Sequence, residues 1–137
     1  MRIVIIEETT ELRNLLIDII STNFKAWAIE KIVYFSSPAE ENVSEALKTA
    51  DVVIYGMNFY EKISIEFISM VKGSWSAPIL IATSGIPDHE MLATEAGADF
   101  FIPQPNIIKK LKMSLSFIAW FELKAETLLW KNRALSN

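Results

Sequence analysis

The hydrophobic and polar positions along the chain form a pattern that predicts strands alternating with helices. Four short runs are apolar almost throughout and rich in β-branched residues, which is typical of strands buried on both faces of a parallel sheet. They cover residues 2–6, 51–56, 78–83 and 99–102, and a less regular run at 28–35 predicts a fifth strand. Between these runs, apolar residues recur every three or four positions, as on a helix with one buried face.

Residues at the ends of the helical segments predict where each helix begins and ends. The first helix follows the pair Thr9-Thr10, either of which can cap it. The segment Ser37-Pro38-Ala39-Glu40 has the residue order of a capping box and predicts the start of the second helix. The third helix covers residues 63–72, and the fourth begins at a cap on Asp88 and is ended by Gly97. The last helical pattern runs from Asn106 to about Leu135 without Gly or Pro.

Alternating strands and helices predict an α/β fold. We expect a doubly wound, five-stranded parallel sheet with helices on both faces. Right-handed crossovers favour the flavodoxin-like strand order 2-1-3-4-5 at this size. Residues 1–118 complete this domain, and residues 119–137 form an extension of the C-terminal helix that serves dimerisation or links the domain to an output domain.

Composition excludes several classes of function. The chain has 137 residues, 51% of them hydrophobic, which is enough for one domain with a proper core. Cysteine is absent, so disulfides and thiolate metal sites are excluded, and the formal net charge of −4 disfavours nucleic-acid binding. No run approaches the ~20 apolar residues of a membrane span. The apolar run at the amino terminus is too short for a signal peptide. We therefore expect a cytoplasmic protein that is not bound to a membrane.

The candidate site lies where the strands end. In open α/β sheets, ligands bind at the carboxyl ends of the strands. Here the first strand is followed by Glu7 and Glu8, the third ends at Gly56, and the fourth ends at Thr83. Gly56 offers no side chain for chemistry, and Asp51 lies at the other end of its strand, about 16 Å away. The sequence also contains neither a GxGxxG motif nor a Walker A motif.

These strand ends, together with the segment Gly97-Ala98-Asp99-Phe100-Phe101-Ile102-Pro103-Gln104-Pro105, resemble the receiver domains of bacterial two-component response regulators. The resemblance covers residues 1 to about 118. It implies the receiver fold and a pocket in which a histidine kinase transfers a phosphoryl group to an aspartate at the end of the third strand. In the family, an acidic pair holds Mg²⁺ in this pocket, and a hydroxyl and a lysine assist.

The resemblance assigns a role to several residues of this chain. The acidic pair corresponds to Glu7 and Glu8, and the hydroxyl corresponds to Thr83. Asn58 falls where a main-chain carbonyl meets the metal, and Phe101 corresponds to the aromatic residue that reports activation.

Two positions depart from the family pattern. Gly56 stands where the family has the acceptor aspartate, and this removes the nucleophile of the reaction. Gln104 stands where the family has the lysine, and a neutral amide needs no anionic partner in a partly buried pocket. Only two carboxylates remain for Mg²⁺, so Glu7 and Glu8 are weak candidate ligands and are otherwise expected to be solvated. We expect no catalytic residue and no cofactor beyond weakly bound Mg²⁺.

The bulky residues near the end of the chain predict a contact surface. The sheet needs roughly a dozen residues of the last helix to cover it, yet large apolar residues continue beyond Ile118. A helix that folds back onto its own domain is the simpler interpretation, and a homodimer or a partner contact is the one we favour. The residues predicted for this interface are Phe100, Trp120, Phe121, Leu128 and Trp130. Of the two neighbouring aromatics Phe100 and Phe101, we expect one in the core and one exposed, and His89 is expected to be solvated.

These observations predict a pseudo-receiver, meaning a receiver-like protein-interaction module that signals without phosphorylation. It would not be an enzyme, and its partner would be a protein of a two-component-type pathway. One alternative is a sensor or enzyme that uses the pocket at the carboxyl edge for a small ligand or a metal. Another is a dimerisation unit excised from a larger regulator.

Overall fold

The structure is a computed structural model that describes residues 1–24, 29–58, 60–74 and 76–120. Within these residues, strands and helices alternate as the sequence predicts. The strands are β1 (Arg2–Ile6), β2 (Lys31–Phe35), β3 (Val52–Gly56), β4 (Ile79–Ser84) and β5 (Phe100–Pro103). The helices are α1 (Thr10–Asn23), α2 (Val43–Lys48), α3 (Glu61–Lys72) and α4 (His89–Ala96), followed by the short 3₁₀ turn η1 (Gln104–Asn106). Residues 107–120 are also helical and are called the C-terminal helix below.

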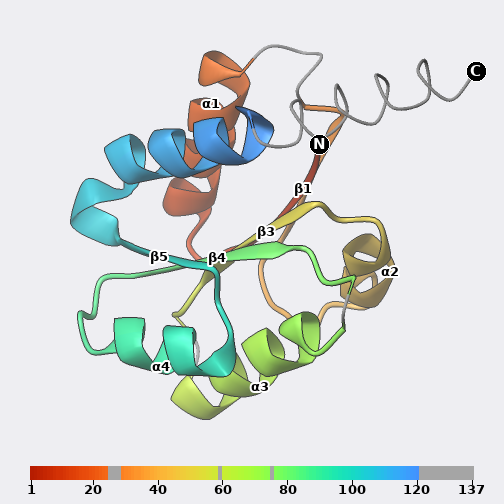
Figure 1. Cartoon of the computed structure of the whole chain (residues 1–137), viewed down its shortest axis with the longest axis vertical. Coiled ribbons are helices and arrows are strands. Elements are labelled where there is room, and N and C mark those ends of the chain that lie inside the picture. The colour runs from red at the N-terminus through yellow and green to blue at the C-terminus, as the bar shows by residue number, and fades with distance from the viewer. Residues whose placement is uncertain (25–28, 59, 75, 121–137) are drawn as a thin grey trace, which may run out of the picture.

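The five strands form one sheet in the order β2-β1-β3-β4-β5, and every neighbouring pair is parallel. The predicted doubly wound fold is therefore confirmed. Figure 1 shows α1 and the C-terminal helix on one side of this sheet and α3 and α4 on the other. Within the described residues, none of the helices has the length and apolar character that spanning a lipid bilayer requires.

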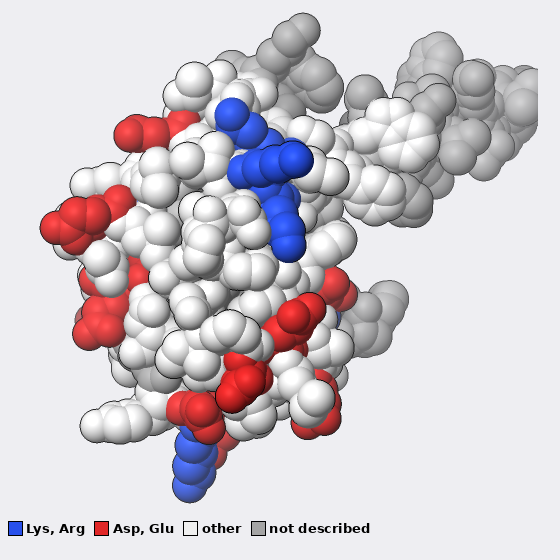
Figure 2. Space-filling view, turned by 90° about the vertical axis from the view of Figure 1, so that its left-hand side faces the viewer, with Lys and Arg blue, Asp and Glu red and all other residues white. Residues whose placement is uncertain are grey.

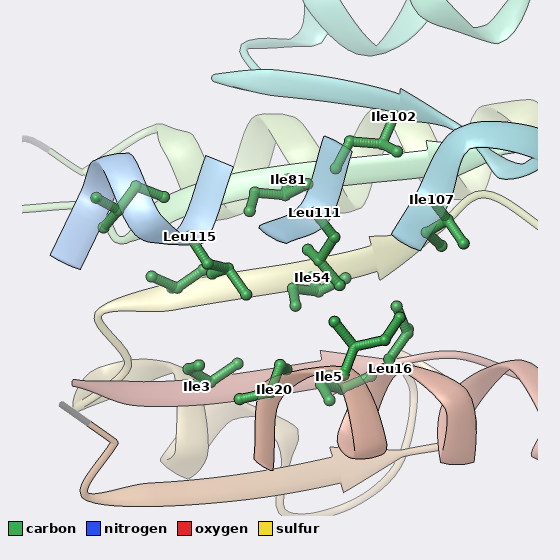
Figure 3. Close-up of a cluster of buried hydrophobic side chains, with 13 residues drawn as sticks. Ile3, Ile5, Leu16, Ile20, Ile54, Ile81, Ile102, Ile107, Leu111 and Leu115 are labelled. Atoms are coloured by element: carbon green, nitrogen blue, oxygen red, sulfur yellow. The ribbon is translucent and has the colours of Figure 1, made fainter. Parts of the chain in front are cut away.

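Side chains of alternate strand residues enter two separate hydrophobic clusters. The first cluster lies between the sheet and two helices, α1 and the C-terminal helix. In it, Ile5 and Ile54 of the strands pack near Leu16 and Leu111 of the helices (Figure 3). The second cluster lies on the opposite face, under α2, α3 and α4. Because successive strand residues point to opposite faces, each central strand contributes to both clusters. This explains the unbroken apolar runs in the sequence.

The second helix begins later than the capping signals predict. The structure places turns at residues 38–42, and α2 starts only at Val43. The capping chemistry is nevertheless present, since the Glu40 carboxylate accepts hydrogen bonds from the main-chain N–H groups of Ser36 and Ser37. Residues 38–42 include no large apolar side chain that could face the sheet, so these bonds hold a turn in place of a helix.

Smaller differences affect the ends of other elements. The strand predicted at 28–35 is observed as Lys31–Phe35, and the strands predicted to end at Thr83 and Ile102 each extend by one residue. The predicted end of α4 at Gly97 is confirmed, because Gly97 has the left-handed φ of 116° that closes a helix.

Candidate functional site

Three predicted site residues lie in a row on one side of the sheet at its carboxyl edge. Glu7 follows Ile5 by two positions, Gly56 follows Ile54, and Thr83 follows Ile81. The three isoleucines all belong to the first cluster, so the three site positions share the side of the sheet that α1 covers. Gly56 and Thr83 are also register partners in neighbouring strands. The structure therefore brings together the acidic, glycine and hydroxyl positions named from the sequence.

Glu7 occupies the space that a side chain at Gly56 would need. A Cβ atom added to Gly56 would overlap Glu7 Oε2 and would lie 2.8 Å from Glu7 Cδ. Glu7 is completely buried. The absence of a side chain at Gly56 thus leaves the room that the Glu7 carboxylate fills.

The two oxygens of the Glu7 carboxylate have different surroundings. Oε1 accepts a hydrogen bond from the main-chain N–H of Thr9 at 3.1 Å and another from the Asn58 side-chain amide. Oε2 is buried and accepts no hydrogen bond from any residue that the structure describes. Within the same residues, the buried hydroxyl of Thr83 also has no hydrogen-bond partner. Two unsatisfied polar atoms therefore lie in the same row, on either side of Gly56.

Burial raises the pKa of the Glu7 carboxyl above its ordinary value. The negative charge of Glu8 acts in the same direction, while the hydrogen bonds from Thr9 and Asn58 lower the pKa, with burial as the largest influence. The expectation that both acidic residues are solvated is wrong for Glu7, while Glu8 is exposed.

The carboxylates do not fit the Mg²⁺ that the resemblance implies. Magnesium requires near-octahedral oxygen ligation. One oxygen of Glu7 already accepts two N–H donors, and the other lies buried over Gly56. Among the described residues, no three His, Cys, Asp or Glu side chains come close enough together to hold a metal ion.

The remaining predicted pocket residues lie around this row. Gln104 is partly buried, and its side-chain oxygen lies 3.1 Å from where a Cβ atom on Gly85 would be. Asn58 touches the site through its side chain, which holds Glu7. Phe101 is partly buried against the second cluster and Phe100 against the first, so the expectation that one of them is exposed is wrong. An interface role for Phe100 stays a prediction.

A polar network on the other side of the sheet was not predicted from the sequence. Ser84 Oγ lies 2.8 Å from His89 Nδ1, and His89 Nε2 lies 3.5 Å from the Glu61 carboxylate. His89 is only 4% exposed, so the prediction that it is solvated is wrong. It is buried because α4 starts directly after a tight turn, in which Ser84 Oγ also accepts the N–H of Ile86. His89 lies five positions after Ser84 in the sequence, and nothing in that spacing alone signals the contact.

A hollow opens beside Glu8, between the loop that follows β1 and the segment that follows β3. It is lined by Glu8, Asn58, Tyr60 and Ile63 and has a volume of about 350 Å³. Tyr60 is 84% exposed and Ile63 is 41% exposed. The strand order reverses between β1 and β3, and such a switch point is where open α/β sheets bind ligands.

A surface with separated charges lies on the side of the molecule that carries α4 and the start of the C-terminal helix. Figure 2 shows Lys and Arg side chains gathered in one patch toward the top of this face and Asp and Glu side chains over its left and lower parts. The C-terminal helix exposes Lys109 and Lys110, and α4 exposes Glu90 and Glu95.

Three of the five residues predicted for an interface, Phe121, Leu128 and Trp130, lie outside the described residues. Of the other two, Trp120 is 56% exposed and Phe100 is partly buried.

Comparison with known proteins supports the fold. No family model and no curated protein sequence matches this chain. Solved structures do match it. The N-terminal domain of an uncharacterized protein from Wolinella succinogenes is 23% identical with a TM-score of 0.73, and the match covers 91% of this chain and 98% of that one. The signal receiver domain of a DNA-binding response regulator from Colwellia psychrerythraea is 20% identical with a TM-score of 0.72, over 85% of this chain and 96% of that one.

An atypical orphan response regulator, described as having a phosphorylation-independent regulatory mechanism, is 21% identical with a TM-score of 0.69, over 88% of this chain and 97% of its own. At these levels of identity the likeness establishes the fold. The chain has the flavodoxin-like fold of response regulator receiver domains.

Proposed function

We propose that this chain is a pseudo-receiver, a signalling module of the two-component type that acts through protein contacts and not through phosphorylation. One observation carries the proposal. The position of the acceptor aspartate is Gly56, and the Glu7 carboxylate fills the volume in which an acceptor side chain would lie. The site therefore lacks the nucleophile, and it also lacks the space that a nucleophilic side chain at position 56 would need.

Neighbouring carboxylates do not replace the missing acceptor. Asp51 lies at the opposite end of β3, where its carboxylate accepts the main-chain N–H of Arg2 at 2.7 Å. Glu7 is buried beneath the Asn58 amide, so an incoming phosphoryl donor cannot reach it without moving that side chain. Gln104, in place of a lysine, leaves no cation at the end of β5 to balance a phosphoryl group.

The likeness to an orphan response regulator with a phosphorylation-independent mechanism is compatible with this proposal. We propose further that the partner is a protein, that the chain forms a homodimer and that it works in the cytoplasm. The net charge of −4 supports a partner other than a nucleic acid.

Incubation with acetyl phosphate and Mg²⁺ tests the proposal. Intact-protein mass spectrometry is expected to show no added phosphoryl group, and beryllofluoride with Mg²⁺ is expected to leave the tryptophan fluorescence unchanged. A receiver domain that retains its acceptor aspartate, treated in parallel, is the positive control. Stoichiometric phosphate that is acid-stable and base-labile would contradict the proposal.

A second candidate function is a sensor for a small ligand. The hollow lined by Glu8, Asn58, Tyr60 and Ile63 favours it, because this hollow lies at the switch point between β1 and β3. The two functions do not exclude each other, because the hollow and the residues predicted for the interface are different parts of the chain.

A further inference from the structure

A cavity lies between the edge strand β2 and the helix α2. Its volume is about 290 Å³. Its floor includes alternate residues of two neighbouring strands, Lys31, Val33 and Phe35 of β2 and Arg2 and Val4 of β1, and residues of α2 form the opposite wall. Alternate strand residues share a face, so the cavity lies on the side of the second cluster, opposite to the row around Gly56.

The cavity stays open because α2 is short and places small side chains over β2. The helix has six residues and begins only after a series of turns. Ala46 of α2 and Ala50 just beyond it line the cavity, and their methyl groups do not fill the space above the strand. Val33 and Phe35 are consequently only partly buried, whereas the apolar residues of β1 on the same face are buried. The strand thus offers apolar surface that a ligand can cover.

One end of the cavity carries two cationic residues. Arg2 and Lys31 are register partners at the start of β1 and β2. The Arg2 guanidinium pairs with the Glu30 carboxylate at 3.1 Å, whereas exposed Lys31 forms no ion pair with another described residue. Arg2 holds the pKa of Glu30 below its ordinary value, and the charge of Lys31 has the smallest influence on that pKa. The carboxylate in the wall, Glu45, is paired with Lys48 at 2.8 Å.

We propose that this cavity binds a free monocarboxylate with a short aliphatic body. The carboxylate pairs with Lys31, and the body covers Val33, Phe35 and the methyl group of Ala46. A single negative charge matches one unpaired cation, whereas a dianion such as phosphate would bring excess negative charge close to Glu45. The ligand is small, because the volume lies near the lower limit of about 300 Å³ for ligand pockets.

The inference goes beyond the proposed function, because this cavity shares no lining residue with the site around Gly56. A chain that binds no carboxylate and takes up no phosphoryl group refutes only the carboxylate site. A chain that binds the carboxylate and is also phosphorylated refutes only the pseudo-receiver.

Titration of the ¹⁵N-labelled full chain with sodium hexanoate at neutral pH tests the inference. We expect saturable shifts of the amide resonances of Val33, Ala46 and Ala50. Hexan-1-ol, n-hexylammonium chloride and sodium chloride at equal concentration are expected to produce none of these shifts. An acetylated dipeptide that ends in leucine is expected to bind more weakly than hexanoate, because its main chain exceeds the small cavity.

Two variants sharpen the test. Lys31→Met removes the charge and keeps a side chain of similar length, and it is expected to weaken hexanoate binding about two- to fivefold, as loss of a partly exposed ion pair does. Lys62→Met, at an exposed position of α3 outside the cavity, is the matched control and should bind as the unaltered chain does. Ala46→Leu places a larger side chain in the cavity on a residue type that favours helix, and it should weaken binding at least about tenfold.

Several results would overturn the inference. Absence of saturable shifts, or equal shifts with hexan-1-ol, would show that no carboxylate is recognised, and shifts confined to Glu8 and Asn58 would place the ligand in the other hollow. Tighter binding of the dipeptide would assign the cavity to the C-terminus of a protein partner. Full affinity in a folded Lys31→Met or Ala46→Leu variant would exclude this cavity. If Ala46→Leu does not fold, Lys31→Met with its Lys62→Met control decides.

Discussion

The buried carboxylate of Glu7 accepts two N–H donors, and no ion pair with it is seen among the described residues. The hydrogen bonds from Thr9 and Asn58 partly offset the cost of burial, yet burial has the larger influence on the pKa of Glu7 and raises it. Folding therefore favours the protonated form of this group. The stability that Glu7 contributes is fully present below the pKa of an unfolded glutamate, and it is lost as the pH rises through the higher pKa of the folded state.

Glu7→Gln is expected to remove this part of the pH dependence. The chain with Glu7 should become more stable as the pH falls from neutral toward the ordinary glutamate value of 4.5, whereas the variant should gain less over the same range. At neutral pH the variant should have the higher free energy of unfolding, because a neutral amide avoids burying a charge. Urea unfolding at a series of pH values measures both the pH dependence of the free energy of unfolding and its difference between the two chains at neutral pH. Glu11→Gln, at an exposed position, is the control, and an unchanged pH profile for Glu7→Gln would contradict the argument.

Ser84 supports the turn between β4 and α4 on the other side of the sheet. Its hydroxyl accepts the N–H of Ile86 at 3.0 Å and pairs with the buried ring of His89. Ser84→Ala should lower the free energy of unfolding by about 1–3 kcal/mol, since it leaves buried polar groups without partners. Ser69→Ala, at an exposed position on α3, should change it by less than about 0.5 kcal/mol. Equal denaturation midpoints for the two variants would show that the network does not stabilise the fold.

The sequence identifies the members of the site more readily than their contacts. Glu7, Gly56 and Thr83 can be identified from the sequence because each lies at the end of a predicted strand. Side chains along a strand alternate between the two faces, and each of the three lies two positions after an isoleucine of the first cluster, so all three lie on one side of the sheet. The burial of Glu7 depends on Asn58, which is 51 residues away, and on the room left by Gly56. Contacts between residues so far apart in sequence arise from packing of the whole fold, and a local pattern does not contain them.

At the scale of elements, the spacing of apolar residues along the chain predicts strands and helices most reliably, because only residues on the buried faces must be apolar. The central strands are covered on both faces, so their apolar runs mark them clearly. The start of α2 was predicted wrongly because capping residues stabilise a turn as readily as a helix when the following side chains have nothing to bury. Helix ends are better predicted where the backbone itself requires one residue type, as at Gly97.

Gly97→Ala is expected to destabilise the fold by about 1 kcal/mol or more. The backbone at Gly97 has a φ of 116°, which an alanine adopts only with strain, and its Cβ would lie 3.2 Å from Lys72 Cβ. Gly73→Ala is the matched control, because Gly73 also follows a helix but has an ordinary φ of −74°. Thermal melting of the two variants should show the larger loss for Gly97→Ala. A larger loss for Gly73→Ala would contradict the assignment of strain to Gly97.

At the scale of the molecule, the C-terminal helix covers part of one face of the sheet. Among the described residues, Ile118 is the last member of the first cluster, which packs this helix against the sheet. Large apolar residues nevertheless continue in the sequence with Trp120, Phe121, Leu123, Leu128, Leu129 and Trp130. The sheet face under α1 and the C-terminal helix is already covered by then, so we expect these side chains to contact a second copy of the chain.

Truncation after Ile118 is expected to convert a dimer into a monomer and to leave the α/β domain folded. Burial of a large aliphatic or aromatic side chain contributes about 1.5–3 kcal/mol, so several such residues on each chain suffice for association. Sedimentation velocity of the full and the truncated chain measures the change, and circular dichroism shows whether the sheet persists. Because these contacts are apolar, added salt should weaken the dimer only modestly. If the full chain sediments as a monomer at high micromolar concentration, the helix must instead fold back onto its own domain, and the dimer is refuted.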